Sequence, residues 1–191
     1  MYSTLSELTD SLQYTLTHSP DGFSIIDATA LREKAIDMLI MSALFSQNEA
    51  VIIQSRNIIR QAAAESGIVP SSILPLYKAI AKGEIEGFTV PAMNVRTLTY
   101  DLARAAFRVA MQKQVGPFIF EIARSEMDYT EQSHEEFAVC ILAAAIKEGY
   151  KGPVFLQGDH YQVRKKHFLE YPDEEIVAIK GLIDKAIEAQ F

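Results

Sequence analysis

The stretch Val154-Phe155-Leu156-Gln157-Gly158-Asp159-His160 decides how the rest of this chain is interpreted. Gly152-Pro153 precedes it, and an apolar run bounded by such residues predicts a strand buried on both faces, as in a parallel sheet. Asp159 and His160 follow at the carboxyl end of this strand. Because parallel α/β proteins bind ligands at the carboxyl ends of their strands, both residues are candidates for a functional site.

Two similar units of strand and helix come before this stretch. Gly87 opens a predicted strand over residues 88–95, and Gly116-Pro117 opens another over 118–123. Three such units in succession predict parallel strands joined by right-handed helical crossovers, in a barrel or in a doubly wound sheet.

Helix caps in the sequence mark where the helices of these units begin. Ser133 and Glu136 have the spacing of a capping box, which predicts a helix that runs to Gly149. Asp173 is expected to cap the final helix, which carries isoleucine and leucine at helical spacing.

Residues 1–86 have a different pattern of polar and apolar residues, which predicts an all-helical N-terminal region. Apolar residues recur there at helical spacing, Asp27 or Thr29 is placed to cap one helix, and Gly67 is placed to end another. No catalytic pattern occurs in this part. We therefore expect a helical region over residues 1–86 followed by the strand-and-helix units over 87–191.

The composition is that of an ordinary globular protein. The chain has 191 residues, of which 49% are hydrophobic and 23% are charged, and its formal net charge is -7. The dispersed acidic balance argues against nucleic acid as a partner, because phosphate backbones need a concentrated basic face. The one basic run, residues 164–167, is interpreted either as a solvated loop or helix start, or as a phosphate-binding patch.

The cysteine content and the apolar runs indicate a cytoplasmic protein. Cys140 has no partner for an internal disulfide and lies among apolar residues, so we expect a small buried hydrophobe in a reducing compartment. No stretch approaches the roughly 20 apolar residues that a membrane span needs. Residues 1–4 lack a basic n-region followed by an apolar run, so we expect no signal peptide.

Polar residues recur at the carboxyl ends of all three predicted strands. Asn94 ends the first, Glu121 and Ser125 lie in and after the second, and Gln157 precedes Asp159 on the third. We expect Asn94, Glu121 and Ser125 to contact a substrate at this rim, although Asn94 alone is equally suited to satisfying loop backbone groups. Glu121 lies within an apolar strand, so it must be paired or face a wet interior.

Histidine spacing alone does not define a metal site. His160 at a strand end is a suitable zinc ligand, but a catalytic zinc site needs three protein ligands. His167 follows in a predicted loop at a spacing that matches no common short metal motif, and His134 is expected at an exposed helix start.

The three strand motifs together resemble the class II, zinc-dependent sugar-bisphosphate aldolases. The motifs are Phe88-Thr89-Val90-Pro91-Ala92-Met93-Asn94-Val95, Gly116-Pro117-Phe118-Ile119-Phe120-Glu121, and Val154 to His160 after Gly152-Pro153. The resemblance implies the first three βα units of a (β/α)₈ TIM barrel. It also implies a cytoplasmic enzyme of carbohydrate metabolism and glycolysis that cleaves a ketose bisphosphate.

The resemblance also implies a role for individual residues. His160 would be a Zn²⁺ ligand, Asp159 would exchange a proton with the aldehyde-derived hydroxyl, and Asn94 would contact the phosphorylated sugar. The segment after Glu121 differs from fructose-type members and is closer to tagatose-type relatives. The other zinc ligands of the family belong to later units, so we expect a fragment of a longer enzyme, a homo-oligomer, or completion by a partner chain.

Two further interpretations do not require catalysis. A non-catalytic aldolase-like scaffold that binds a partner chain is favoured by the long helical N-terminal region. A doubly wound small-molecule binder is the other, and the sequence has neither Gly-x-Gly-x-x-Gly nor a Gly-x-x-x-x-Gly-Lys loop for a nucleotide.

Overall fold

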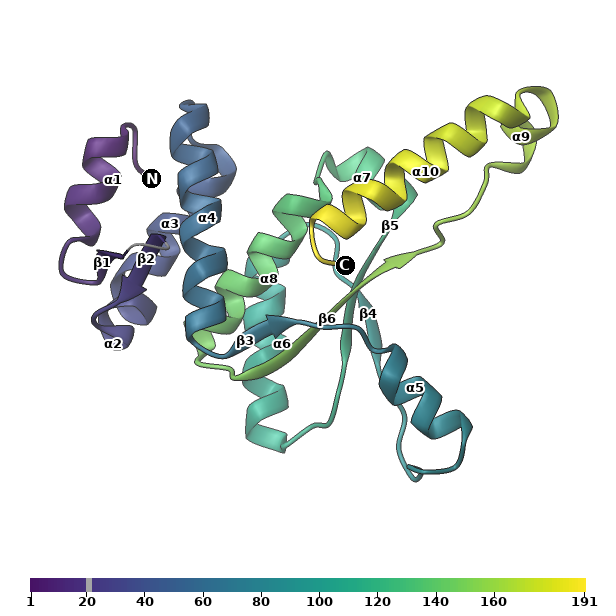
Figure 1. Cartoon of the computed structure of the whole chain (residues 1–191), viewed down its shortest axis with the longest axis horizontal. Helices are drawn as coiled ribbons and strands as arrows, with labels where there is room; N and C mark the ends of the chain where they lie inside the picture. The colour runs from purple at the N-terminus through teal and green to yellow at the C-terminus, as the bar shows by residue number, and fades with distance from the viewer. Residues whose placement is uncertain (20–21) are drawn as a thin grey trace. The chain divides into compact units, whose positions relative to one another are not determined.

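The computed structural model describes residues 1–19 and 22–191 as a mixed α/β protein, with its elements labelled in Figure 1. The chain forms two compact units, each built from three segments. Unit 1 contains Met1–Val69, Leu98–Val115 and Val139–Val154, and unit 2 contains Pro70–Thr97, Gly116–Ala138 and Phe155–Phe191. The boundary expected near residue 86 divides the chain differently from these two units, and it stays a prediction.

Unit 1 is mainly helical, and local caps define where its helices begin. Asp27 accepts a hydrogen bond from the Ala30 backbone N–H at 2.9 Å, as expected for an N-cap. Gly67, at a φ of +75°, follows the longest helix of this unit. The helices are α1 (Leu5–Leu12), α2 (Ala28–Ala30), the π-helical turn η1 (Leu31–Ala35), α3 (Ile36–Phe45), α4 (Glu49–Glu65), α6 (Thr99–Lys113) and most of α8 (His134–Glu148).

The all-helical expectation for residues 1–86 is wrong at three short strands. β1 (Leu16–Ser19) and β2 (Gly22–Ile25) pair antiparallel, and β3 (Ile68–Pro70) follows α4. Phe23 and Ile25 are good strand formers, and a neighbouring segment supplies the hydrogen-bonding partner that helical periodicity does not reveal.

The core of unit 1 consists of apolar faces from α3, α4, α6 and α8. Side chains at helical spacing are fully buried, such as Leu39 on α3 and Ile59 on α4. Residues 139–146 of α8 are buried on every side, and Cys140 among them is 1% exposed, which confirms the expected small buried hydrophobe.

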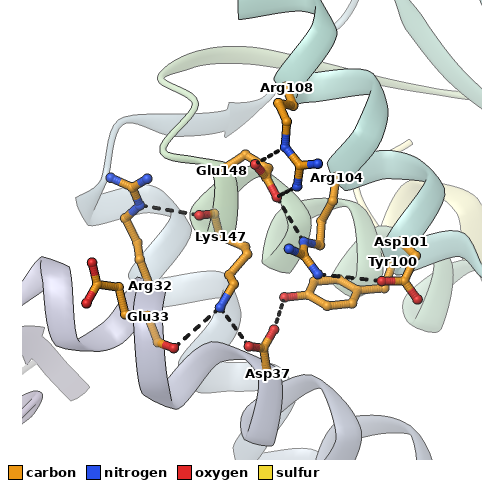
Figure 2. A network of polar contacts seen from close by, with 9 residues as sticks. All are labelled: Arg32, Glu33, Asp37, Tyr100, Asp101, Arg104, Arg108, Lys147 and Glu148. Atoms are coloured by element: carbon orange, nitrogen blue, oxygen red, sulfur yellow. Dashed lines mark hydrogen bonds and ion pairs between the residues drawn. The ribbon is translucent and has the colours of Figure 1, made fainter.

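A polar network connects helices of unit 1 through Asp37 (Figure 2). The Tyr100 hydroxyl donates to Asp37 Oδ1 at 2.7 Å, and Lys147 Nζ lies 2.7 Å from Asp37 Oδ2. Burial disfavours the charged form of Asp37, but the hydrogen bonds from Lys147 and Tyr100 outweigh it and lower the pKa of this carboxyl. α3, α6 and α8 are therefore joined by one carboxylate.

A second part of the same network is centred on Glu148 (Figure 2). Arg104 donates to Glu148 Oε1 at 2.9 Å, while Arg108 donates to both carboxylate oxygens, at 2.8 and 3.0 Å. The hydrogen bond from Arg108 is the largest cause of the lowered pKa of Glu148, and Arg104 adds to it. Such charge-assisted pairs link α6 to the end of α8.

Unit 2 contains most of the parallel strands that the sequence predicts, since residues 152–154 of the last strand belong to unit 1. β4 (Ala92–Asn94), β5 (Ile119–Ala123) and β6 (Gly152–Asp159) lie side by side in Figure 1, in a sheet of order β3-β6-β5-β4. β4 pairs parallel with β5, and β5 pairs parallel with β6. The helices of this unit are α5 (Leu74–Ala81), α7 (Arg124–Thr130), α9 (Lys165–Glu170) and α10 (Pro172–Glu188).

Burial of the strands differs from the expectation for β6. All five residues of β5 are buried, whereas on β6 Val154 and Leu156 are buried and Phe155 and Gln157 are only half-buried. The prediction that β6 is buried on both faces is therefore wrong. Phe155 and Gln157 alternate onto the same face as Asp159, and this face of β6 is less buried than the face that carries Val154 and Leu156.

Two other boundaries differ from the sequence-based expectation. β4 includes only three residues of the predicted strand 88–95. α10 begins at Pro172 rather than after an Asp173 cap, because proline is suited to the first helical position, and Asp173 lies in the first turn. The Ser133 cap is confirmed, since its Oγ accepts from the Glu136 backbone N–H at 3.2 Å.

The helices within the described residues include none that is both long and apolar enough to cross a membrane.

Candidate functional site

Polar side chains from three strands form one row at the carboxyl end of the unit 2 sheet. Asn94 on β4 is in register with Glu121 on β5, and Glu121 is in register with Gln157 on β6. Residues in register on parallel strands project from the same face of a sheet. Asp159 lies two residues beyond Gln157 and therefore extends this polar face towards the rim.

The Asn94 side chain joins two carboxylates at this rim. Its amide nitrogen donates to Asp159 Oδ2 at 2.9 Å and to Glu126 Oε2 at 3.1 Å. One amide group thus holds together residues from β4, β6 and α7. We call Asn94, Glu121, Glu126 and Asp159 the carboxylate cluster.

Glu126 is among the polar residues that follow β5 in the sequence, but it was not one of the predicted substrate contacts. It is 5% exposed, it accepts from the Ala123 backbone N–H at 2.9 Å, and it pairs with the Arg96 guanidinium. Glutamate at the third position of a helix commonly reaches back to the N-cap backbone, so its spacing from the end of β5 was an available signal. No local sequence pattern indicated that Arg96 would contact this cluster.

Glu121 is a buried carboxyl group, 8% exposed, within an apolar strand. Gln157 Nε2 donates to its Oε2 at 3.1 Å, so the expectation that it must be paired holds. Burial, followed by the negative charge of Asp159, raises the pKa of Glu121 above its usual value. The side chain therefore keeps a proton to higher pH than an exposed glutamate.

Asp159 and His160 are brought together by a turn. His160 has a φ of +50°, and this left-handed conformation ends the alternation of side chains that would place the two residues on opposite faces. His160 Nε2 lies 3.6 Å from Asp159 Oδ1. The side chain of Asp159 is 26% exposed and that of His160 is 73% exposed, so both are open to a ligand.

The packing of Tyr161 leaves no room for a side chain at position 158. A Cβ atom added to Gly158 would lie 2.4 Å from the Tyr161 ring, so this ring packs directly on the backbone. The Tyr161 hydroxyl in turn lies 2.6 Å from His134 Nε2.

Ser125, the remaining predicted substrate contact, lies just beyond the carboxylate cluster on α7. It is exposed and lines a cavity of 470 Å³ together with Arg124 and His160. The structure therefore places Asn94, Glu121 and Asp159 within one cluster, and Ser125 and His160 in the adjacent cavity.

The histidines do not form a zinc site with one another. His134 is 3% exposed and bonded to Tyr161, so the expectation of an exposed side chain is wrong, and His167 lies 3.1 Å from Glu175. Among residues 1–19 and 22–191, no three His, Cys, Asp or Glu side chains are grouped closely enough to hold a metal ion. His160 with one nearby carboxylate does not meet the three-ligand requirement of catalytic zinc.

No protein-family model, curated protein or solved structure matches this chain.

Proposed function

We propose that the chain is a class II aldolase-like protein that takes part in the reversible aldol cleavage of a ketose bisphosphate. The observation that carries the proposal is the Asn94 amide, which holds Asp159 and Glu126 at one rim of a parallel sheet. Proton transfer to and from sugar hydroxyls needs a carboxylate that is positioned and accessible. Asp159 meets both conditions.

Asp159 performs the proton transfer in this proposal. As a base it takes the proton from the substrate hydroxyl next to the bond that breaks, and the bond's electron pair moves towards the ketose carbonyl. In the direction of synthesis, the protonated Asp159 returns that proton to the aldehyde oxygen. Glu121 supports this role, since burial and the charge of Asp159 raise its pKa above the usual value and so disfavour a second negative charge beside Asp159.

The fold is consistent with the first three units of a TIM barrel. β4, β5 and β6 are parallel, adjacent and in chain order, as consecutive strands of a (β/α)₈ barrel are. Under this proposal, the functional rim is the carboxyl edge on which Asn94 and Asp159 lie. The remaining barrel strands would belong to a longer polypeptide or to a partner chain, and the first of them would take the place beside β6 that β3 holds in this sheet.

The zinc ion that the resemblance implies also stays a proposal. His160 would be the ligand from this chain, and the other ligands would come from the same source as the remaining strands. The proposed setting is cytoplasmic carbohydrate metabolism, with a phosphorylated sugar as substrate.

The test of this proposal is a cleavage assay with fructose and tagatose bisphosphates in the presence of Zn²⁺ and of the polypeptide that supplies the remaining strands, with the release of triose phosphate as the readout. We expect Asp159→Asn to retain substrate binding and to lose a factor of about 10² to 10⁴ in turnover, as loss of a positioned proton carrier does. Asp184→Asn, at an exposed position of α10, serves as the matched control and should leave the rate unchanged. Cleavage of neither substrate, or equal rates for the two variants, contradicts the proposal.

The alternative function is a non-catalytic scaffold, and exposed apolar residues of α10 favour it. Val177 is 70% exposed, Ile187 is 65% exposed and Ile183 is 42% exposed. Apolar side chains concentrated on one helix are typical of a surface that binds another chain. A stable complex with a partner or a second copy, without any cleavage activity, would favour this alternative.

A further inference from the structure

The start of α7 and the segment after β6 line a second feature of unit 2, an open pocket that we call the basic pocket. It has a volume of 470 Å³ and is lined by Arg124, Ser125, His160 and residues 162–165. The size lies within the range of about 300 to 1,000 Å³ that is usual for small-molecule sites.

The lining of the basic pocket is strongly cationic. Arg124, Arg164 and Lys165 are permanently charged at neutral pH, His160 adds an imidazole, and the lining residues include no carboxylate. The chain as a whole has a formal charge of -7, so this concentration of positive charge is a local exception. A concave site of one sign attracts ligands of the opposite sign.

A buried carboxylate behind the pocket holds its basic wall in place. Glu175 is 2% exposed and accepts hydrogen bonds from the Arg124 guanidinium at 2.7 Å and from the Arg164 backbone N–H at 2.8 Å. A guanidinium has five N–H donors, so Arg124 keeps donors beyond the one that Glu175 takes. The wall is therefore preorganised for an acceptor-rich ligand.

The other cations are available to a ligand. Arg164 pairs with Asp128, but both side chains are more than half exposed, and surface pairs of this kind are weak and exchangeable. Lys165 forms no ion pair with any residue in the part of the chain that the structure describes.

We propose that the basic pocket binds the phosphate group of a small phosphate monoester. Arginine and lysine are the residues that bind phosphate oxygens most often, arginine through two parallel hydrogen bonds and lysine as a point charge. The Ser125 hydroxyl supplies a further donor at the same wall.

The basic pocket adjoins the carboxylate cluster through His160, which lines the pocket and lies 3.6 Å from Asp159. A ligand with its phosphate in the pocket would extend its carbon atoms towards Asp159. The assignment of the ester as a sugar phosphate rests on the proposed function, whereas the binding of phosphate does not.

The experiment titrates the full chain with inorganic phosphate and with glycerol 3-phosphate at constant ionic strength, by calorimetry and by NMR. We expect saturable binding that shifts the resonances of residues 124, 125 and 162–165. Lys165→Met and Arg164→Gln should each weaken binding about tenfold, as expected for loss of one charged hydrogen-bond donor. Lys166→Met is the matched control, since the neighbouring lysine does not line the pocket, and it should bind as the wild type does.

Several outcomes would overturn the proposal. These are the absence of saturable binding, an equal loss with Lys166→Met, or co-sedimentation with phosphatidic acid vesicles without binding of glycerol 3-phosphate. Circular dichroism of each variant checks that the fold is retained. Phosphate binding that Lys165→Met weakens, without cleavage of any ketose bisphosphate, would support the pocket and contradict the proposed function. Cleavage whose KM is unchanged by Lys165→Met would contradict the pocket alone.

Discussion

At the scale of single residues, Glu121 shows how the sheet changes the chemistry of a side chain. Its position in β5 buries it beside Asp159, and both effects raise its pKa above the usual value of 4.5. The folded state therefore binds more protons than the unfolded state between pH 4.5 and the raised pKa. By linkage, ionisation of Glu121 lowers stability as the pH rises through that window.

We predict that Glu121→Gln raises the free energy of unfolding at about pH 7.5 and changes it little at about pH 4. Glutamine retains an acceptor for Gln157 and removes the charge that Asp159 repels. Urea denaturation at a series of pH values measures the effect. Glu170→Gln, at an exposed position of α9, is the control, and a gain that is the same at every pH would show that charge is not its cause.

The residue scale also shows which site positions are not visible in the sequence. Asn94 and Asp159 were expected at one rim. Glu126, at the start of α7, also contacts Asn94, and the long side chain of Arg96 pairs with Glu126. The contact of His160 with Asp159 depends on a left-handed backbone, which is uncommon for a residue other than glycine.

At the scale of elements, the network around Asp37 supports the packing of α3, α6 and α8 in unit 1 (Figure 2). Burial raises the pKa of Tyr100 far above its usual value, so its hydroxyl remains a donor at all ordinary pH values. The lowered pKa of Asp37 means that its contribution is present above the unfolded-state pKa and is lost as the pH falls through the folded-state value.

We predict that Tyr100→Phe costs about 1 kcal/mol in the free energy of unfolding at neutral pH, because it removes one hydrogen bond to a partly exposed carboxylate. Phenylalanine retains the ring under the Arg104 guanidinium. A double-mutant cycle with Asp37→Ala, which removes the acceptor, should show a coupling energy of similar size. Tyr129→Phe, on an exposed side chain, is the control, and additive effects of Tyr100→Phe and Asp37→Ala would contradict the prediction.

Elements differ in how far the sequence predicts them. β5, the N-cap of α8 and the turn after α4 follow local patterns, and the structure contains all three. The antiparallel pair of β1 and β2 does not follow from the local pattern, because its stability depends on pairing rather than on periodicity.

At the scale of the whole molecule, exposed apolar residues favour association with another chain. Val177 and Ile183 on α10 are 70% and 42% exposed, and each adds apolar area that burial in an interface would stabilise. Both the aldolase-like proposal and the scaffold alternative expect such an association.

We predict that the native mass in solution exceeds the 21.3 kDa of one chain and that a Val177→Lys and Ile183→Lys double variant lowers it to that value. Charged side chains at these two exposed positions of α10 disfavour their burial in an interface and should leave the thermal midpoint nearly unchanged. Light scattering coupled to size-exclusion chromatography measures the mass. Val109→Lys, at an exposed position of α6, is the control, and a monomeric wild type would contradict the prediction.

The sequence by itself determined the parallel order of the last three strands, several helix ends and the burial of Cys140, because periodicity and caps act over a few residues. Only the tertiary structure decided that Asn94 meets Glu126 and Asp159, 32 and 65 residues away, and that Glu121 is buried beside a like charge. These hydrogen bonds and this pKa depend on distances between segments that are remote in the chain, and local sequence patterns do not determine those distances.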